Sequence, residues 1–329
     1  MVAGLRSISL EALDPHIRMV DAWHDGTSIA DLLEVSFRDE SMDENGRRMI
    51  RMLRNYGPFE SFVLEGPPGF VWVEDGQIVG NVGIQRNPMR RDTWIIGNVA
   101  THPSFRDRGI ASALLAAIIH YAYARGARNI ALQVMEGNMP AQHVYEKHGF
   151  ISVGAITYYR RASVRTQPVW HDISASTTLA VRNTVWADKD HVWRMTRANV
   201  PDELTYAEPF DDRVYRLNLR WRMLNFFTGN PERWLMGEEG SFVVGAVRTR
   251  VNIESSEHHL ELMLAPDADE GSGITLLEQA LKLFEGCINR PILATQARPH
   301  ASAHAALQAM GFKPQRTLIH MVLDTEQTT

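Results

Sequence analysis

Two hydrophobic periods alternate along the N-terminal half of the chain. Apolar residues recur at helical spacing over residues 28–37 and 109–123, whereas apolar and polar positions alternate over residues 77–85. We therefore expect helices at 28–37, 43–55, 109–123 and 140–148, and strands at 17–20, 70–73, 77–85, 94–101, 129–134 and 156–160. Antiparallel hairpins combined with one strand–helix–strand unit predict an α/β fold, in which a mixed, mostly antiparallel sheet is flanked by helices.

The C-terminal half repeats the N-terminal half. Gly149-Phe150 closes one predicted helix and Gly311-Phe312 closes another, while Leu114-Leu115 matches Leu276-Leu277 at the same offset. Val79-Gly80 likewise matches Val244-Gly245. The sequence therefore predicts two copies of one fold, with domains at 1–165 and 179–329 joined by a polar linker at 166–178.

A basic turn that contains glycine connects the strand at 94–101 to the helix at 109–123. The first N–H groups of a helix lack partners inside the helix, and the helix dipole adds partial positive charge there. Such a helix start favours a phosphate or pyrophosphate group. Gly109 and Ala111 would let the anion approach the backbone, and Arg106 and Arg108 would add charge. Taken alone, the turn also fits an ordinary connection with solvated arginines.

This turn and the segments after it resemble the GNAT acetyltransferase superfamily. Motif A of that family, Arg/Gln-x-x-Gly-x-Gly/Ala, corresponds to Arg106-x-x-Gly109-x-Ala111. Asn138 follows the fifth strand as the family's asparagine does, and Tyr145-x-x-x-Gly149-Phe150 resembles the end of the motif B helix. The match in order and spacing extends over residues 17–161, so the chain is identified as resembling a tandem GNAT protein.

The resemblance implies acetyl-CoA as cosubstrate and no metal. It implies that the fourth strand splays from the fifth, and that pantetheine and the acyl arm extend along the fourth strand. Asn138 would hydrogen-bond the pantetheine, and Arg106 would add charge near the pyrophosphate. The backbone would contact the arm at Val99, Ala100 and Thr101, and the pyrophosphate at Asp107, Arg108, Gly109, Ile110, Ala111 and Ser112.

Acylation of an amine needs a polarised thioester carbonyl and a proton for the departing thiolate. The resemblance places Tyr145 near the sulfur, as candidate general acid; the alternative is an aromatic packing residue. Glu136 is a tentative general base, although a solvated or ion-paired glutamate is the more ordinary interpretation of this residue. His102 could also serve as the base, although a surface histidine is the more ordinary interpretation, and ordered water could replace a base altogether.

The expected acceptor is a primary amine of a small molecule or peptide. An acidic stretch could attract it, or could be a solvated face: Glu34, Asp39, Glu40, Asp43 and Glu44. Tyr158 and Tyr159 lie on the last strand, and one of them could face the acceptor. The alternative function is a non-catalytic acyl-CoA-binding sensor or interaction module. An ATP-binding loop is disfavoured, because the turn lacks a Gly-Lys-Ser/Thr ending.

The second copy has lost the chemistry of the first. Its turn carries Asp267, Asp269 and Glu270 where the first copy has arginines, and carboxylates oppose the binding of a diphosphate. His300 replaces Asn138, and Leu307 replaces Tyr145. We expect this degenerate domain not to bind CoA productively. It would provide structural support, complete the acceptor site or form a dimer contact.

Composition and net charge bear on the partners and location that we expect for this protein. The 329 residues carry a net charge of −5, which gives no broad basic face for nucleic acid. One cysteine, Cys287, excludes an intrachain disulfide, and no apolar stretch approaches the ~20 residues of a transmembrane helix. We therefore expect a cytoplasmic enzyme without nucleic-acid or membrane partners, and leave homodimerisation open.

Overall fold

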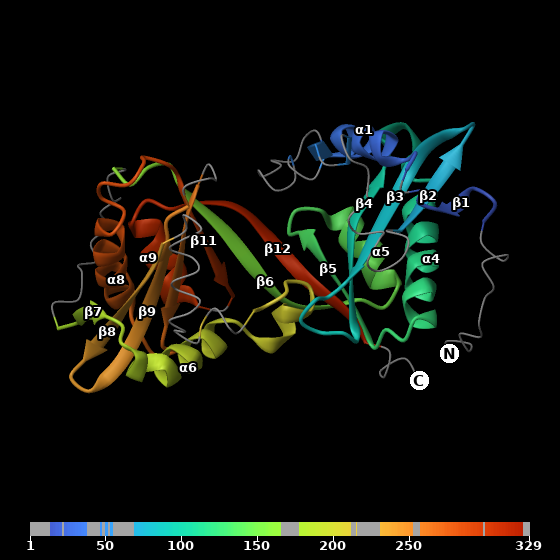
Figure 1. Cartoon of the computed structure of the whole chain (residues 1–329). Coiled ribbons are helices and arrows are strands. Elements are labelled where there is room, and N and C mark those ends of the chain that lie inside the picture. Colours follow the sequence, from blue (N-terminus) through green and yellow to red (C-terminus); the bar gives the residue numbers. More distant parts are fainter. Residues whose placement is uncertain are drawn as a thin grey trace. The chain divides into compact units, whose positions relative to one another are not determined.

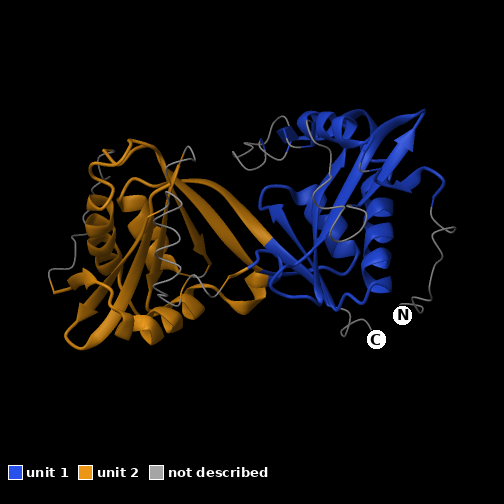
Figure 2. Ribbon diagram, viewed as in Figure 1, with its two compact units in different colours: residues 1–153, 206–209, 320–329 blue, residues 154–205, 210–319 orange. Residues whose placement is uncertain are grey.

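The computed structural model describes residues 14–21, 23–37, 47, 50–51, 53–54, 69–165, 178–211, 215, 231–252, 257–298 and 300–324. The chain forms two units (Figure 2). Unit 1 comprises residues 1–153, 206–209 and 320–329, and unit 2 comprises residues 154–205 and 210–319. The domain boundaries given above stay a prediction, and residues 166–177 of the proposed linker lie outside the described residues.

Unit 1 contains most of the elements predicted for the first copy (Figure 1), whereas the strand predicted at 156–160 belongs to unit 2. Those in unit 1 are β1 (Ile17–Met19), α1 (Gly26–Ser36), β2 (Gly69–Glu74), β3 (Gln77–Arg86), β4 (Thr93–Thr101), η2 (Pro103–Phe105), α4 (Ile110–Ala124), β5 (Asn129–Met135) and α5 (Met139–Lys147). β1 to β4 pair antiparallel in order, whereas β4 and β5 are parallel. The predicted helix at 43–55 falls largely outside the described residues; its described residues are helical.

Unit 2 repeats this order. It contains β7 (Ala180–Asn183), η3 (Trp186–Asp188), α6 (Lys189–Asn199), η4 (Asp202–Tyr206), β8 (Glu232–Glu239), β9 (Phe242–Arg250), β10 (His258–Leu264), α8 (Glu270–Lys282), β11 (Ile292–Ala297) and α9 (Ala301–Ala309). β7 to β10 pair antiparallel in order, and β10 and β11 are parallel. The predicted repeat and the predicted fold class, a mixed sheet flanked by helices, are therefore confirmed.

Two strands change unit along their length (Figure 2). β6 (Ile151–Arg161) begins in unit 1 and continues in unit 2, where it pairs antiparallel with β11. β12 (Lys313–Asp324) begins in unit 2 and ends in unit 1, and β5 is one of its neighbours in the sheet. Each unit therefore includes chain from both halves of the sequence.

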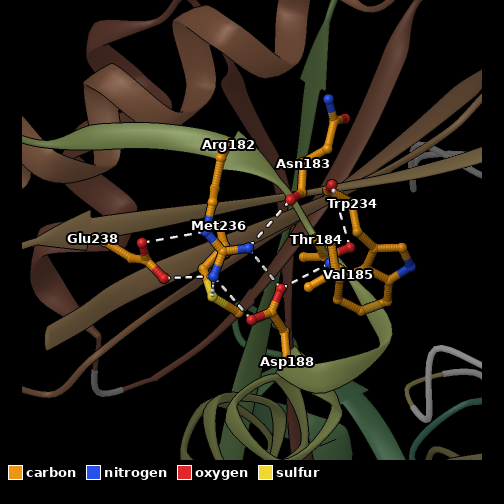
Figure 3. Close-up of polar contacts among 8 residues, drawn as sticks. All are labelled: Arg182, Asn183, Thr184, Val185, Asp188, Trp234, Met236 and Glu238. Atoms are coloured by element: carbon orange, nitrogen blue, oxygen red, sulfur yellow. Dashed lines mark hydrogen bonds and ion pairs between the residues drawn. The ribbon is translucent and has the colours of Figure 1, made fainter. Parts of the chain in front are cut away.

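The first strand of each unit is tied to the following helix by an equivalent ion pair. In unit 1, Arg18 donates to both oxygens of Asp25 at 2.6 and 2.8 Å, and Asp25 lies at the start of α1. In unit 2, Arg182 donates to both oxygens of Asp188 at 2.7 and 2.9 Å and also to Glu238 (Figure 3). Because a bidentate arginine–carboxylate pair fixes geometry as well as charge, both helices start at a defined point beside the sheet.

A glycine lets the long helix of each unit approach its sheet closely. A Cβ on Gly80 of β3 would lie 2.7 Å from Cγ2 of Ile110 and 2.9 Å from Cδ1 of Leu114 on α4. A Cβ on Gly245 of β9 would lie 2.8 Å from Cδ1 of Leu276 on α8. These contacts explain why the Val-Gly and Leu-Leu pairs recur at matching places in both copies, and they fix where α4 begins relative to β4.

Candidate active site

β4 and β5 pair over only part of their length. The parallel register joins Thr93–Ile96 to Asn129–Leu132, and among the described residues it continues no further, although β4 extends to Thr101 and β5 to Met135. The two strands therefore separate at their carboxyl ends, as the family resemblance implied. Backbone groups on the facing edges are then available to a ligand.

A bulge in β4 accompanies this separation. Asn98 has a φ of 54°, and the β3–β4 register shifts between Asn81 and Gly83. The Asn81 side chain donates to the carbonyl oxygen of Asn98 at 2.8 Å, which holds the bulged backbone in place. A bulge of this kind bends a strand and re-aims the residues that follow it, here Val99 to Thr101.

A cavity of about 700 Å³ lies at the ends of these strands. The ends of α1, β4 and β5, the turn before α4, and the starts of α4 and α5 line it. Its lining residues are Ser36, Phe37, Val99, Ala100, Thr101, Phe105, Arg106, Asp107, Gly109, Ile110, Ala111, Ser112, Met135, Gly137, Asn138, Pro140, Ala141, Val144 and Tyr145. The structure thus brings together most of the residues that the sequence motifs singled out.

The start of α4 meets this cavity without a side-chain cap. Gly109 is its N-cap residue, with a left-handed φ of 78° and no capping hydrogen bond. A Cβ there would meet nothing within 4 Å, so the backbone is open to a ligand. Because the first N–H groups of the helix lie at the cavity and carry the positive end of the dipole, this site fits a pyrophosphate.

The two arginines of the turn have different surroundings. Arg106 lines the cavity and donates to the carbonyl oxygen of Ser36 at 3.2 Å. Arg108 forms a 2.6 Å ion pair with Glu74, and its guanidinium carbon lies 5.2 Å from the Phe105 ring centroid. A hydrogen bond from Arg108 lowers the pKa of the Glu74 carboxyl. Arg106 is therefore the better placed of the two to add charge at the cavity.

A histidine that sequence reasoning missed contacts the same helix start. The Ser112 hydroxyl lies 2.8 Å from Nε2 of His148, at the end of α5. Burial lowers the pKa of His148, which favours its neutral form. The ring therefore orients the Ser112 hydroxyl without adding charge. No local pattern marks His148, since the contact spans 36 residues.

Asn138 and Gln142 position α5 beside the cavity. Asn138 lines the cavity and caps the helix, where its side-chain oxygen accepts the Ala141 N–H at 3.2 Å. Gln142 is buried and donates to the carbonyl oxygens of Met135 and Glu136 at 3.1 and 2.8 Å. The amide of Gln142 thereby fixes the distance between the end of β5 and the helix that carries Tyr145.

The predicted acid and base lie in different environments. Tyr145 lines the cavity, is 7% exposed and packs edge-on against Phe150. Glu136 is exposed and lies between two cavity-lining residues, Met135 and Gly137. His102 accepts the Ser104 N–H through its ring nitrogen and begins η2.

The predicted acceptor residues are only partly described. Glu34 pairs with Arg54 at 3.0 Å on the surface of unit 1, and Asp39, Glu40, Asp43 and Glu44 lie outside the described residues. Tyr159 is 2% exposed in the core of unit 2, and its hydroxyl lies 2.8 Å from Nδ1 of His304. The guanidinium group of Arg316 lies over the Tyr158 ring in the same unit.

The corresponding place in unit 2 is filled. The Asp269 carboxylate caps α8 by accepting the Ser272 N–H at 2.8 Å, and hydrogen bonds from the Ser272 side chain and backbone lower the pKa of Asp269. A Cβ on Gly273 would lie 2.7 Å from the Cβ of Ala306 on α9. Leu307, which aligns with Tyr145, is fully buried in the core. A carboxylate thus occupies the helix start, and helix packing occupies the groove beside it.

Comparison with known proteins agrees with this geometry. Residues 27–150 match the Acetyltransferase (GNAT) family. The N-terminal half of the chain is therefore similar to the GNAT family. The chain is 37% identical over 87 residues to acetyltransferase ECA0875 of Pectobacterium atrosepticum, a match covering 26% of this chain and 60% of that protein. It is 30% identical over 93 residues to mycothiol acetyltransferase of Corynebacterium glutamicum, covering 28% of this chain and 27% of that protein. The matched stretch thus spans less than two thirds of either relative.

Solved GNAT structures match almost the whole chain. A GCN5-related N-acetyltransferase from Sphaerobacter thermophilus aligns with a TM-score of 0.62 at 14% identity, covering 95% of this chain and 96% of that one. A tandem GNAT protein from the clavulanic acid biosynthesis pathway aligns with a TM-score of 0.50 at 15% identity, covering 94% and 98%. At these identities the likeness concerns the fold, and it confirms the predicted tandem GNAT architecture.

Other classes of site are not evident in the described part of the chain. Within the described residues, no group of three or more His, Cys, Asp or Glu side chains is arranged to hold a metal ion. The helices of that same part include none that is both long and apolar enough to cross a membrane. Cys287 is a free, partly buried thiol.

Proposed function

We propose that unit 1 transfers an acyl group, by default acetyl, from acyl-CoA directly to a primary amine of a small molecule or peptide. The observation that carries this proposal is the uncapped start of α4 at Gly109, which opens on a 700 Å³ cavity between separating strands. An N-terminus without its own cap at a cavity of that size suits an anionic ligand with a long arm.

In this proposal the backbone N–H groups from Asp107 to Ser112 bind the pyrophosphate, and Arg106 adds charge. The pantetheine arm follows the free edge of β4 from Val99 to Thr101, and Asn138 contacts it from α5. Acyl-CoA supplies the activated thioester. The protein contributes orientation and a polar contact for the carbonyl oxygen as charge develops on it.

The transfer itself forms one bond and breaks one. The neutral amine nitrogen attacks the thioester carbonyl carbon, the carbon–nitrogen bond forms, and the carbon–sulfur bond breaks. Tyr145 donates its phenolic proton to the departing thiolate, and Glu136, directly or through water, accepts the proton that the amine loses. The buried position of Tyr145 in the cavity wall supports its role.

Unit 2 has no CoA site in this proposal, since Asp269 and the α8–α9 packing occupy the equivalent place. It supports unit 1 or forms a dimer contact. The proposal keeps the cytoplasm as the location of the enzyme, with no nucleic-acid or membrane partner and no metal cofactor.

Thiol release from acetyl-CoA across a panel of primary amines tests the proposal, with CoA binding measured separately by calorimetry. Tyr145→Phe is expected to lower kcat about 100-fold or more while CoA binding is kept, because it removes only the acid. Tyr123→Phe is the matched control, since it lies about 20 Å along α4 from the helix start. Tight CoA binding without turnover of any amine would favour the acyl-CoA sensor instead.

A further inference from the structure

A four-residue segment from the middle of the chain, residues 206–209, is part of unit 1. The Asn87 side chain donates to the carbonyl oxygen of Tyr206 at 3.0 Å, and the Arg90 guanidinium carbon lies 4.5 Å from the Tyr206 ring centroid. Ala207 is buried in an apolar cluster with Ala131 and Val322. Hydrogen bonding, cation–π contact and apolar packing together fix the position of the next residue, Glu208.

Glu208 belongs to a polar cluster with Gln133 and His320, here named the Gln133 cluster. The Gln133 amide nitrogen lies 3.3 Å from Oε2 of Glu208 and 3.0 Å from Nε2 of His320. That amide has two N–H donors, so it can donate to both groups when Nε2 of His320 carries no proton. His320 is fully buried, whereas the Glu208 side chain is 43% exposed. The cluster therefore orients one carboxylate oxygen of a side chain that is still partly exposed.

Gln133 places the cluster on β5, the strand whose end lines the cavity. Gln133 lies two residues before Met135 on β5, and Met135 lines the cavity. Side chains two apart on a strand point to the same face, about 7 Å from one another at ~3.4 Å per residue. Gln133 also follows Leu132, the last β5 residue paired with β4. The carboxylate thus lies on a face of β5 that continues into the cavity, where the strands have already separated.

A carboxylate held outside the lining of the cavity suits a second charge on the acceptor rather than the reacting amine. The reacting amine must be neutral to attack the thioester, and a carboxylate beside it would favour its protonated form. A carboxylate therefore suits a different, positively charged group of the same molecule. We propose that Glu208, positioned by Gln133 and His320, recognises a cationic group of the acceptor, and that the acceptors are diamines or amines with a second positive charge. This inference rests on acyl transfer from CoA to an amine by unit 1.

Calorimetric titration of the full chain, saturated with CoA, tests this assignment. The probes are 1,4-diaminobutane, which carries a second cation, and 1-aminobutane, which does not. The diamine is expected to bind the unmodified protein about tenfold more tightly than the monoamine, and Glu208→Gln is expected to remove that preference. Glu203→Gln makes the same charge change at an exposed position on η4 and is expected to keep it.

Equal diamine binding by Glu208→Gln and the unmodified protein would overturn the assignment. So would a diamine that binds the unmodified protein no better than the monoamine. CoA is titrated first into the unmodified protein and into each variant, and this titration separates the two proposals. If the unmodified protein does not bind CoA, the proposed acyltransferase activity itself is rejected. CoA binding by Glu208→Gln shows that its unit 1 is folded. Where an amine turns over, Glu208→Gln should raise its KM and leave kcat and the KM for acetyl-CoA unchanged.

Discussion

Gly273 of α8 and Ala306 of α9 lie so close that a Cβ on the glycine would meet the alanine Cβ at 2.7 Å. In unit 1 the aligned positions are Ala111 and Val144, and both line the cavity. The same pair of helices therefore encloses a groove in one unit and closes it in the other. The two units thus share a fold, while the space beside these helices is open in unit 1 and filled in unit 2.

The closed groove predicts the stoichiometry of CoA binding. Calorimetric titration should give one CoA per chain, because the start of α8 is capped by Asp269 and its groove is filled. Arg106→Ala should weaken the binding of this one CoA molecule, since Arg106 lines the unit 1 cavity. Two CoA molecules per chain would show that unit 2 opens in solution.

Gly109 is predicted to be needed for CoA binding beyond any effect on stability. Gly109→Ala places a side chain at φ 78°, which costs about 1–2 kcal/mol, and its Cβ enters the space where the pyrophosphate is proposed. CoA affinity should fall at least about tenfold. Gly76→Ala is a matched control in the β2–β3 hairpin: its φ is 77° and a Cβ there also meets nothing within 4 Å. Equal CoA affinity in both variants would remove Gly109 from the site.

Gly80 is predicted to be needed for packing. A Cβ at this position would clash with Ile110 and Leu114, so Gly80→Ala should destabilise the protein by about 1–3 kcal/mol in urea unfolding. Gly97→Ala on the neighbouring strand meets nothing within 4 Å and should stay within about 0.5 kcal/mol of the unmodified protein. A neutral Gly80→Ala would mean that α4 does not rest on β3 as described.

The Arg182–Asp188 pair predicts acid sensitivity. Hydrogen bonding to Arg182 lowers the pKa of Asp188 below its usual value. A carboxyl whose folded pKa is depressed contributes its full stability above the unfolded pKa of about 4, and loses that contribution as pH falls through the folded pKa. Asp188→Asn should therefore be less stable than the unmodified protein at pH 7, and the difference should shrink below about pH 4.

Urea unfolding at pH 7, 5 and 3 measures this effect, with the exposed Asp190→Asn as control. A constant difference between Asp188→Asn and the unmodified protein at all three pH values would contradict the linkage. Asp190→Asn should show little difference at any of them, because its side chain is exposed.

Local patterns predicted the elements, but not the contacts between distant segments. The strand expected at 94–101 is Thr93–Thr101, and the helix expected at 109–123 is Ile110–Ala124, because their periods are long and regular. The motif residues gathered at one cavity because a strand, a turn and a helix start follow one another directly in the sequence.

The Gln133 cluster could not be predicted in this way. Gln133 and His320 are 187 residues apart, and Glu208 lies in a segment without a regular period. The pairing of Arg108 with Glu74 also went unpredicted, since a charge in a sequence does not reveal which partner the fold will bring near. In each case the sequence pattern does not show which distant residues become neighbours in the folded chain.

The crossing of β6 and β12 has a consequence for biosynthesis. The sheet of unit 1 includes residues 320–324, which the ribosome makes last among the described residues. A nascent N-terminal half can form its hairpins and helices but leaves the edge of β5 without that neighbour until translation has passed the second copy. Completion of unit 1 is thus delayed until the second copy has been made, and before that stage the exposed edge of β5 is where chaperones or premature association would act.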